Sequence, residues 1–176
     1  MLAGMLKLSL LRHAKSSWDD PELPDHDRPL ARRGTRDAPR MGARMLADGL
    51  VPDLIMCSGA VRARATLTMV LAEWAQARPR IVYDDALYLA EPRALLARLA
   101  TLGGTCQHVL LVGHNPGLHA LALELTGAGE RRELAHLALG FPTAALASIE
   151  FAAGRWGEIA PGQGRLRLFV TPKQLA

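Results

Sequence analysis

Three short segments carry the residues that could do chemistry, and each follows an apolar run. The first run ends in Arg12-His13, the second is followed by Arg62, and the third by His114. If these runs are parallel strands, their carboxyl ends lie along one edge of a sheet, where ligands bind in open α/β folds. Two histidines and two arginines at such an edge would form a cationic pocket suited to a phosphoryl group.

His13 has the chemistry of a nucleophile. A neutral imidazole nitrogen attacks phosphorus well, and the phosphohistidine that forms is labile enough to hydrolyse. The other ring nitrogen must then be held by an acceptor, such as a backbone carbonyl, so that the correct tautomer faces the phosphate. Arg12 follows a buried run, where a guanidinium needs an anion or a buried partner. We therefore expect His13 to be the nucleophile and Arg12 to bind the phosphate.

Arg62 and His114 are expected to complete this pocket. Arg62 begins the helix after the second run, so its guanidinium could bind phosphate oxygens in bidentate fashion. His114 precedes Asn115-Pro116-Gly117, and a helix that starts there presents backbone N–H groups to an anion. The imidazole would hydrogen-bond a nonbridging oxygen and stabilise its developing charge. Taken singly, each residue also fits an ordinary role in a core, a turn or a helix surface.

A general acid is harder to assign. Glu91, in the loop before a helix start, is the nearest carboxylate by position, and Asp84 and Asp85 are weaker candidates. Acids also complement a helix dipole, and Asp favours turns. A phosphohistidine leaves as an imidazole and needs less help from an acid than an alkoxide does. Lys15 and Ser16 follow the nucleophile directly and are expected to touch the phosphate or the partner surface.

Composition narrows the function. The chain has 176 residues, enough for one domain over 1–176, and a net charge of +4. Its basic residues are scattered and only 5% of residues are aromatic, which argues against nucleic-acid binding. Cys57 and Cys106 lack metal-ligand spacing, so we expect buried thiols and neither metal nor cofactor. No apolar stretch reaches the ~20 residues of a membrane span. We expect a cytoplasmic protein.

Apolar runs alternate with segments of helical spacing. Strands are predicted over 5–11, 54–57, 81–83, 108–112, 144–151 and 166–170. Helices are predicted over 34–49, 60–77, 92–102 and 117–127, the first with Thr35 as N-cap and Pro39 in its first turn. Strands that alternate with helices predict a three-layer α/β/α sandwich with a mostly parallel central sheet.

Several motifs, in order along nearly the whole chain, point to a known family. They are Arg-His-Ala-Lys-Ser at 12–16, Asp-His-Asp-Arg-Pro-Leu at 25–30, Ser-Gly-Ala-Val-Arg-Ala-Arg-Ala-Thr at 58–66, Leu-Tyr-Leu-Ala at 87–90, Val-Gly-His-Asn-Pro-Gly at 112–117 and Phe-Val-Thr-Pro-Lys at 169–173. Together they resemble the histidine phosphatase superfamily, and most closely its small bacterial branch, the SixA-type phosphohistidine phosphatases.

The resemblance implies a phosphoglycerate mutase-like fold and assigns roles. It implies that His13 is phosphorylated and that Arg12, Arg62 and His114 line the phosphate pocket. This chain departs from the superfamily at Ala14, where Gly is frequent and the small branch commonly has Ala, and in Ser58-Gly59, where Ser-Pro is usual. The second departure changes the entry to the helix and should leave Arg62 in place.

The resulting hypothesis is a metal-independent phosphatase with a phosphohistidine intermediate. The chain lacks the long insertions that enclose small sugar phosphates in larger relatives, so we expect a phosphohistidine on a protein, such as a histidine phosphotransfer domain, as substrate. One alternative is a phosphatase of small phosphomonoesters, such as a sugar phosphate or a nucleotide, on the same site. Another is a non-catalytic phosphate-binding module, although a binder needs the arginines and no nucleophile such as His13.

Overall fold

The structure, a computed structural model of residues 4–175, is built on one seven-stranded sheet. Residues 1–3 and 176, at the ends of the predicted domain, lie outside the described residues. The strand order is β3-β2-β4-β1-β6-β7-β5. The bounds are β1 Met5–Arg12, β2 Leu54–Ser58, β3 Arg80–Asp84, β4 His108–Gly113, β5 Thr126–Gly129, β6 Leu146–Ala152 and β7 Gly164–Val170. Strands β3, β2, β4 and β1 run parallel, and β6 is antiparallel to β1 and β7.

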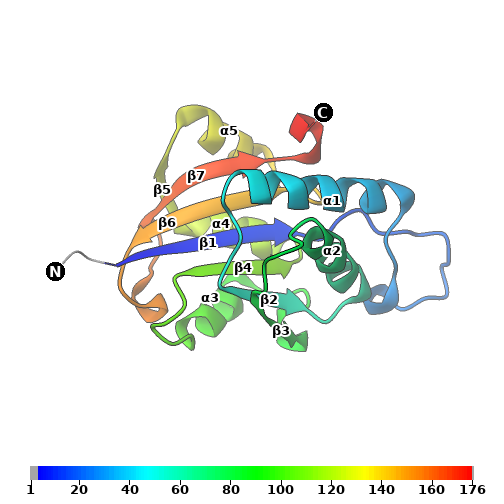
Figure 1. Ribbon diagram of the computed structural model, residues 1–176, viewed down its shortest axis with the longest axis horizontal. Coiled ribbons are helices and arrows are strands. Elements are labelled where there is room, and N and C mark those ends of the chain that lie inside the picture. The colour runs from blue at the N-terminus through cyan, green and yellow to red at the C-terminus, as the bar shows by residue number, and fades with distance from the viewer. Residues whose placement is uncertain (1–3, 176) are drawn as a thin grey trace.

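Helices cover both faces of this sheet (Figure 1), which confirms the three-layer sandwich. Helices α1 and α2 pack on one face, and α3, α4 and α5 pack on the other. Their bounds are α1 Arg32–Ala47, α2 Val61–Ala72, α3 Pro92–Ala100, α4 Gly117–Leu125 and α5 Arg131–Leu139. Short 3-10 turns lie at Asp25–Asp27, Asp85–Leu87, Trp156–Glu158 and Pro172–Leu175. No helix of residues 4–175 is both long and apolar enough to cross a membrane.

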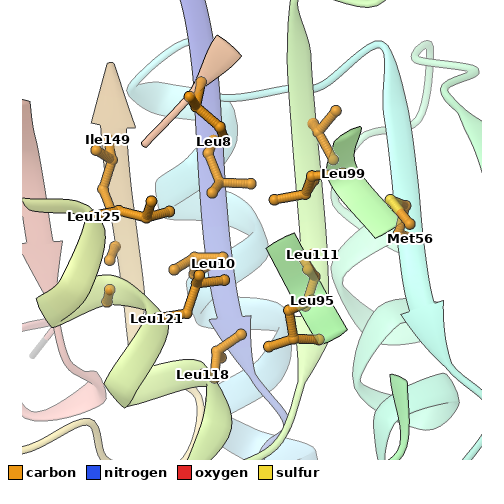
Figure 2. Close-up of a cluster of buried hydrophobic side chains, with 14 of the residues drawn as sticks. Leu8, Leu10, Met56, Leu95, Leu99, Leu111, Leu118, Leu121, Leu125 and Ile149 are labelled. Atoms are coloured by element: carbon orange, nitrogen blue, oxygen red, sulfur yellow. The ribbon is translucent and has the colours of Figure 1, made fainter. Parts of the chain in front are cut away.

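The central strands are buried on both faces, so they are nearly continuous apolar runs. Along β1, Leu8 and Leu10 face the α3 and α4 layer, whereas Leu11 packs with the α1 and α2 layer. Figure 2 shows the first of these cores, in which Leu118 and Leu121 of α4 lie against β1. Each fully buried Leu contributes about 1.5–3 kcal/mol of transfer free energy. These two cores hold the strand ends in place.

The first helix differs from its prediction. Helix α1 begins at Arg32 with Ala31 as N-cap, so the predicted Thr35 cap is wrong. The Thr35 hydroxyl instead donates to the carbonyl of Arg32, 2.9 Å away, which is a bond within the first turn of the helix. Pro39 lies inside the helix rather than in its first turn.

Two further differences concern helix ends and missed elements. Helix α2 ends at Ala72, short of the predicted residue 77, because the next turns tighten and the Trp74 indole donates to the carbonyl of Gly42 on α1. Strand β5 and helix α5 were not predicted. The Thr-Gly-Ala-Gly sequence of β5 has no side-chain pattern, and it forms a strand through pairing with β7.

Gly34 of α1 sets how closely this helix approaches the segment after the nucleophile candidate. A Cβ at Gly34 would lie 2.2 Å from the Lys15 carbonyl oxygen, whereas one at Gly103 would meet nothing within 4 Å. We expect Gly34→Ala to lower the free energy of unfolding by about 1–3 kcal/mol through overpacking, although Ala favours helices. Denaturant unfolding measures this, with Gly103→Ala as the control. Equal stability of the two variants would contradict the close contact.

Candidate active site

His13 lies directly beyond the carboxyl end of β1 and is held by its own backbone surroundings. Its Nδ1 is 2.8 Å from the carbonyl oxygen of Ala14, and its side chain is buried. The Ala14 N–H in turn donates to Thr66 Oγ1 on α2 at 2.9 Å. A carbonyl can only accept, so Nδ1 carries the imidazole proton and Nε2 has the free lone pair. This is the tautomer that a nucleophilic Nε2 requires.

Arg62 reaches the same nitrogen from the first turn of α2. Its Nε lies 3.3 Å from His13 Nε2. Its two Nη atoms donate to the backbone oxygen and to the carboxylate of Asp25, at 2.5 and 2.9 Å. A guanidinium has five N–H groups, so these three bonds leave two N–H donors for an anion. Asp25 therefore fixes the direction of Arg62 without using all of its donors.

His114 follows β4, the strand next to β1, and is oriented by Ser58 at the end of β2. Its Nε2 lies 2.7 Å from Ser58 Oγ, which also accepts from the backbone N–H of Ala60. A serine hydroxyl has one proton and a second lone pair, so Ser58 can donate to Nε2 or accept from it. When it donates, the imidazole proton lies on Nδ1 and is available to an anion. This buried Nδ1 has no hydrogen-bond partner within the described residues.

Arg12 is the last residue of β1, next to His13, and lies half-buried. Its Nη1 donates to the carbonyl of Phe141 at 3.0 Å, and Asn115 Nδ2 donates to the same oxygen at 2.9 Å. The loop that carries this carbonyl is anchored by Ala144, whose N–H contacts the carbonyls of Arg12 and His13. Arg12 Nε is buried and unpaired within residues 4–175.

The expected side chains therefore meet at one edge of the sheet. The ring centroids of His13 and His114 are 5.1 Å apart, and Arg62 contacts His13. Unpaired buried donors are rare in native proteins and often mark a missing ion or water. Two buried nitrogens without a partner in residues 4–175, the donor Arg12 Nε and the ring nitrogen His114 Nδ1, belong to residues of this cluster. The arrangement could bind an anion beside the Nε2 lone pair of His13.

Burial and the two guanidinium groups keep both histidines neutral. Burial, with smaller contributions from Arg62 and Arg12, lowers the pKa of His13 from 6.5 to about 4 against the opposing bond to Ala14. The pKa of His114 falls to about 3, chiefly through burial and then through the charges of His13 and Arg62. At neutral pH, His13 therefore presents an unprotonated Nε2.

Asp25 connects its own loop to the residues around His13 through several hydrogen bonds. Besides Arg62, its carboxylate accepts from the Tyr88 hydroxyl at 2.5 Å and from Arg28 at 3.0 Å. The bond from Tyr88 is the largest of several that lower the pKa of Asp25 to about 2, so the carboxylate stays charged. The Tyr88 ring also meets His114 edge-on, with centroids 5.3 Å apart. The Asp25 carboxylate thus joins its own loop to α2 and to the segment of Tyr88.

The remaining predicted residues lie at the margin of this cluster. Ser16 is buried and its hydroxyl accepts from Arg28 at 2.8 Å, while Lys15 is half-buried with no side-chain partner within the described residues. Glu91 is exposed at the N-cap of α3, and its backbone lies against Gly117 at the start of α4. No hydrogen bond or ion pair among residues 4–175 joins the Glu91 carboxylate to His13 or His114. Its role as an acid stays a prediction.

Several known proteins are similar to this chain in sequence or fold. No family model matches the chain. It is 36% identical to a protein of unassigned function from Mycobacterium tuberculosis, over 93% of this chain and all of that protein. It is 32% identical to a candidate phosphohistidine phosphatase SixA from Agrobacterium tumefaciens, with a TM-score of 0.80 over 95% and 98% of the two chains. A SixA candidate from Nakamurella multipartitia is 29% identical, with a TM-score of 0.77 over 98% and 99%.

The chain belongs to the SixA branch of the histidine phosphatase superfamily. Its phosphoglycerate mutase-like fold is confirmed, and its chemistry is that of a phosphatase of this superfamily.

Sequence reasoning gave no role to several residues of this SixA-type site. Asp25 and Tyr88 lie in segments that carried the family resemblance, but nothing in the sequence shows that their side chains meet Arg62 and His114. Ser58 and Thr66 lie in the motif of Arg62 and were not singled out. The Phe141 carbonyl, a backbone group, leaves no sequence signal at all.

The depressed pKa values of the two site histidines predict how stability depends on pH. Folded His13 takes up its proton near pH 4, whereas in the unfolded chain it does so near 6.5. Between these values protonation favours the unfolded chain, so the free energy of unfolding should fall as the pH falls from about 6.5 to 4. Denaturant unfolding across this range measures the slope, which His13→Gln should reduce. An NMR titration of the wild-type His13 ring with a midpoint near 6.5 would contradict the site's burial.

Ser58 is predicted to act by orienting His114. Ser58→Ala removes the hydroxyl at Nε2 and leaves a buried nitrogen unpaired, which costs about 1–3 kcal/mol. If the cost falls on the transition state, kcat/KM drops by about 10- to 100-fold. Ser148→Ala is the matched control, because that serine is buried in β6 and its hydroxyl has no partner in the described chain. Equal activity of the two variants would show that the Ser58 hydroxyl does not orient His114 for the reaction.

Proposed function

We propose that this protein is a metal-independent phosphohistidine phosphatase that acts on phosphorylated proteins through a covalent intermediate on His13. The observation that carries the proposal is the fixed tautomer of His13. Its Nδ1–H is committed to the Ala14 carbonyl, and its Nε2 faces Arg62 in a cluster with unpaired buried donors. A phosphate-binding module needs those donors, but it has no use for a nucleophile prepared in this way.

In the first step, the Nε2 lone pair of His13 attacks phosphorus in line with the bond that breaks. The long 3.3 Å contact with Arg62 Nε gives way to the new N–P bond. The bond between phosphorus and the substrate imidazole breaks, and that imidazole takes a proton from water. Arg12, Arg62 and His114 bind the three equatorial oxygens, where negative charge is spread in the transition state.

In the second step, water attacks the phosphorus and the His13–phosphorus bond breaks. The proton that this water loses neutralises the hydroxide left when water protonated the substrate imidazole in the first step. Inorganic phosphate leaves, and His13 returns to the neutral form with its proton on Nδ1. The Ala14 carbonyl holds this proton throughout, because the nucleophile gains and loses phosphorus only at Nε2. The net reaction consumes one phosphohistidine and one water.

Metal independence is supported by the charge that the protein itself supplies. Arg12 and Arg62 are guanidinium groups beside neutral histidines, and they offer bidentate donors that match phosphate oxygens. Burial lowers the pKa of Arg12, with Arg62 adding to the effect, so a bound dianion relieves an unfavourable pair of buried cations. Lys15 and Ser16 are proposed as further contacts at the edge of this pocket.

A protein substrate is supported by the surface around the pocket. Trp18 is 70% exposed and stacks on Arg28, which also donates to Asp25, to the Ser16 hydroxyl and to the Ser17 carbonyl. Leu89, which follows Tyr88 in the chain, is 49% exposed. Exposed apolar side chains that flank a polar site are typical of protein-binding surfaces.

The exposed position of Glu91 also fits an imidazole leaving group, which needs little acid catalysis.

The test is turnover of two substrates with EDTA present. A phosphohistidine-carrying phosphotransfer domain and an aryl phosphate are each incubated with the wild-type protein and with His13→Ala, and phosphate release is followed. We expect the protein phosphohistidine to be consumed by the wild-type protein. His13→Ala should lose at least about 10³-fold in rate, as expected when a nucleophile is removed.

Each other outcome revises the proposal in a defined way. Turnover of the aryl phosphate alone would move the substrate to small phosphomonoesters. Loss of activity in EDTA that added metal restores would refute metal independence. Phosphate binding without turnover of either substrate would leave only a binding module.

A further inference from the structure

A second cationic site lies outside the catalytic cluster. It is a hollow of about 940 Å³ between the first half of α1, one side of α5, the loop at 140–143 and the turn at 171–174. Charged side chains of the lining are the cations Arg33, Arg36, Arg40, Arg132 and Lys173 and the single carboxylate of Asp37. None of these residues has a part in the mechanism above.

Positive charge is concentrated in this hollow. Five cations against one carboxylate leave an excess that equals the net charge of +4 on the whole chain. Asp37 is already paired with Arg36 at 2.9 Å, and Arg40 donates to the carbonyl of Leu175. By contrast, Arg33, Arg132 and Lys173 form no ion pair or side-chain hydrogen bond within residues 4–175. They are also exposed, so their charge is available to an anionic partner.

The hollow lies at the same edge of the sheet as the catalytic cluster. Leu11 of β1, Leu146 of β6 and Val170 of β7 form one row across the sheet. Neighbouring strands are about 4.8 Å apart, so the end of β7, which enters the hollow, is roughly 10 Å from the end of β1, which carries His13.

Phe141 also joins the two sites. Its carbonyl accepts from Arg12, and its ring packs on Phe169 of the hollow, with centroids 5.3 Å apart. A protein interface of ordinary size, about 800 Å² on each partner, easily spans this distance. A single partner can therefore contact the hollow and the catalytic cluster at once.

The lining indicates a protein as the occupant. Leu139 is 87% exposed, the most exposed of the large apolar side chains of the described residues, and it lies among the cations. An apolar anchor within a charged rim is typical of a protein-binding surface. The cations also come from three separate segments, which suits a broad acidic surface.

We infer that the hollow docks an acidic surface of the phosphorylated protein whose phosphohistidine enters the catalytic cluster. This inference rests on the proposed function and adds a basis for substrate selection. The hollow would select phosphoproteins that carry acidic residues about 10 Å from the phosphohistidine. Docking at the hollow raises affinity for the protein substrate and has no effect on a small phosphoramidate, which is too short to reach it.

The test compares two triple charge reversals. The docking variant carries Arg33→Glu, Arg132→Glu and Lys173→Glu. The control variant carries Arg80→Glu, Arg93→Glu and Arg165→Glu, which change the net charge equally at exposed positions that do not line the hollow. Kinetics are measured on a phosphotransfer domain with an acidic surface around its phosphohistidine, and on free phosphoramidate.

We expect the docking variant to raise KM for the phosphoprotein by tenfold or more, with kcat and phosphoramidate turnover unchanged and with the control close to the wild-type protein. Equal effects of the two variants, or an equal loss on both substrates, would overturn the docking site and leave the proposed function intact. Failure of the wild-type protein to consume the phosphoprotein, with phosphoramidate still hydrolysed, would instead refute the proposed protein substrate and the docking site with it.

Discussion

The hydrogen bond between His13 Nδ1 and the Ala14 carbonyl decides what this site can do. It fixes the proton on Nδ1 and leaves a lone pair on Nε2, which is the form of the imidazole that the nucleophile role proposed for His13 requires. Burial and the neighbouring guanidinium groups reinforce this state, because they hold the pKa of His13 near 4. The same two guanidinium groups, Arg12 and Arg62, are the phosphate donors in the proposed mechanism. In that mechanism one electrostatic arrangement prepares both the nucleophile and the anion site.

The rest of the fold holds this bond in place. The Ala14 N–H is bound to Thr66 on α2, and the close approach of Gly34 sets α1 against the next residue, Lys15. Strands β1, β4 and β2 run parallel in register, so their ends deliver His13, His114 and the α2 start to one edge. The carboxylate of Asp25, in the loop before α1, accepts a hydrogen bond from Arg62 and fixes the direction of its guanidinium.

The sequence was sufficient for the parts of this site that follow strands. Arg12, His13 and His114 could be placed because apolar runs predict buried strands, and parallel strands share an edge. Asp25 and Tyr88 could not be placed, since they lie in loops whose paths depend on tertiary contacts. Helix α5 was missed for a similar reason: its short sequence alone does not stabilise a helix, and it forms by packing on β7 and α4.

The most direct measurement of the central claim is the location of the phosphoryl group during turnover. The protein is mixed with excess phosphoramidate, quenched in alkali within milliseconds to preserve phosphohistidine, digested and analysed by mass spectrometry and phosphorus NMR. We expect one modified residue, His13, with the phosphoryl group on Nε2, and we expect this modification to disappear as the substrate is consumed. Phosphate on His114 or on Nδ1 of His13, or turnover without any phosphoenzyme, would contradict it.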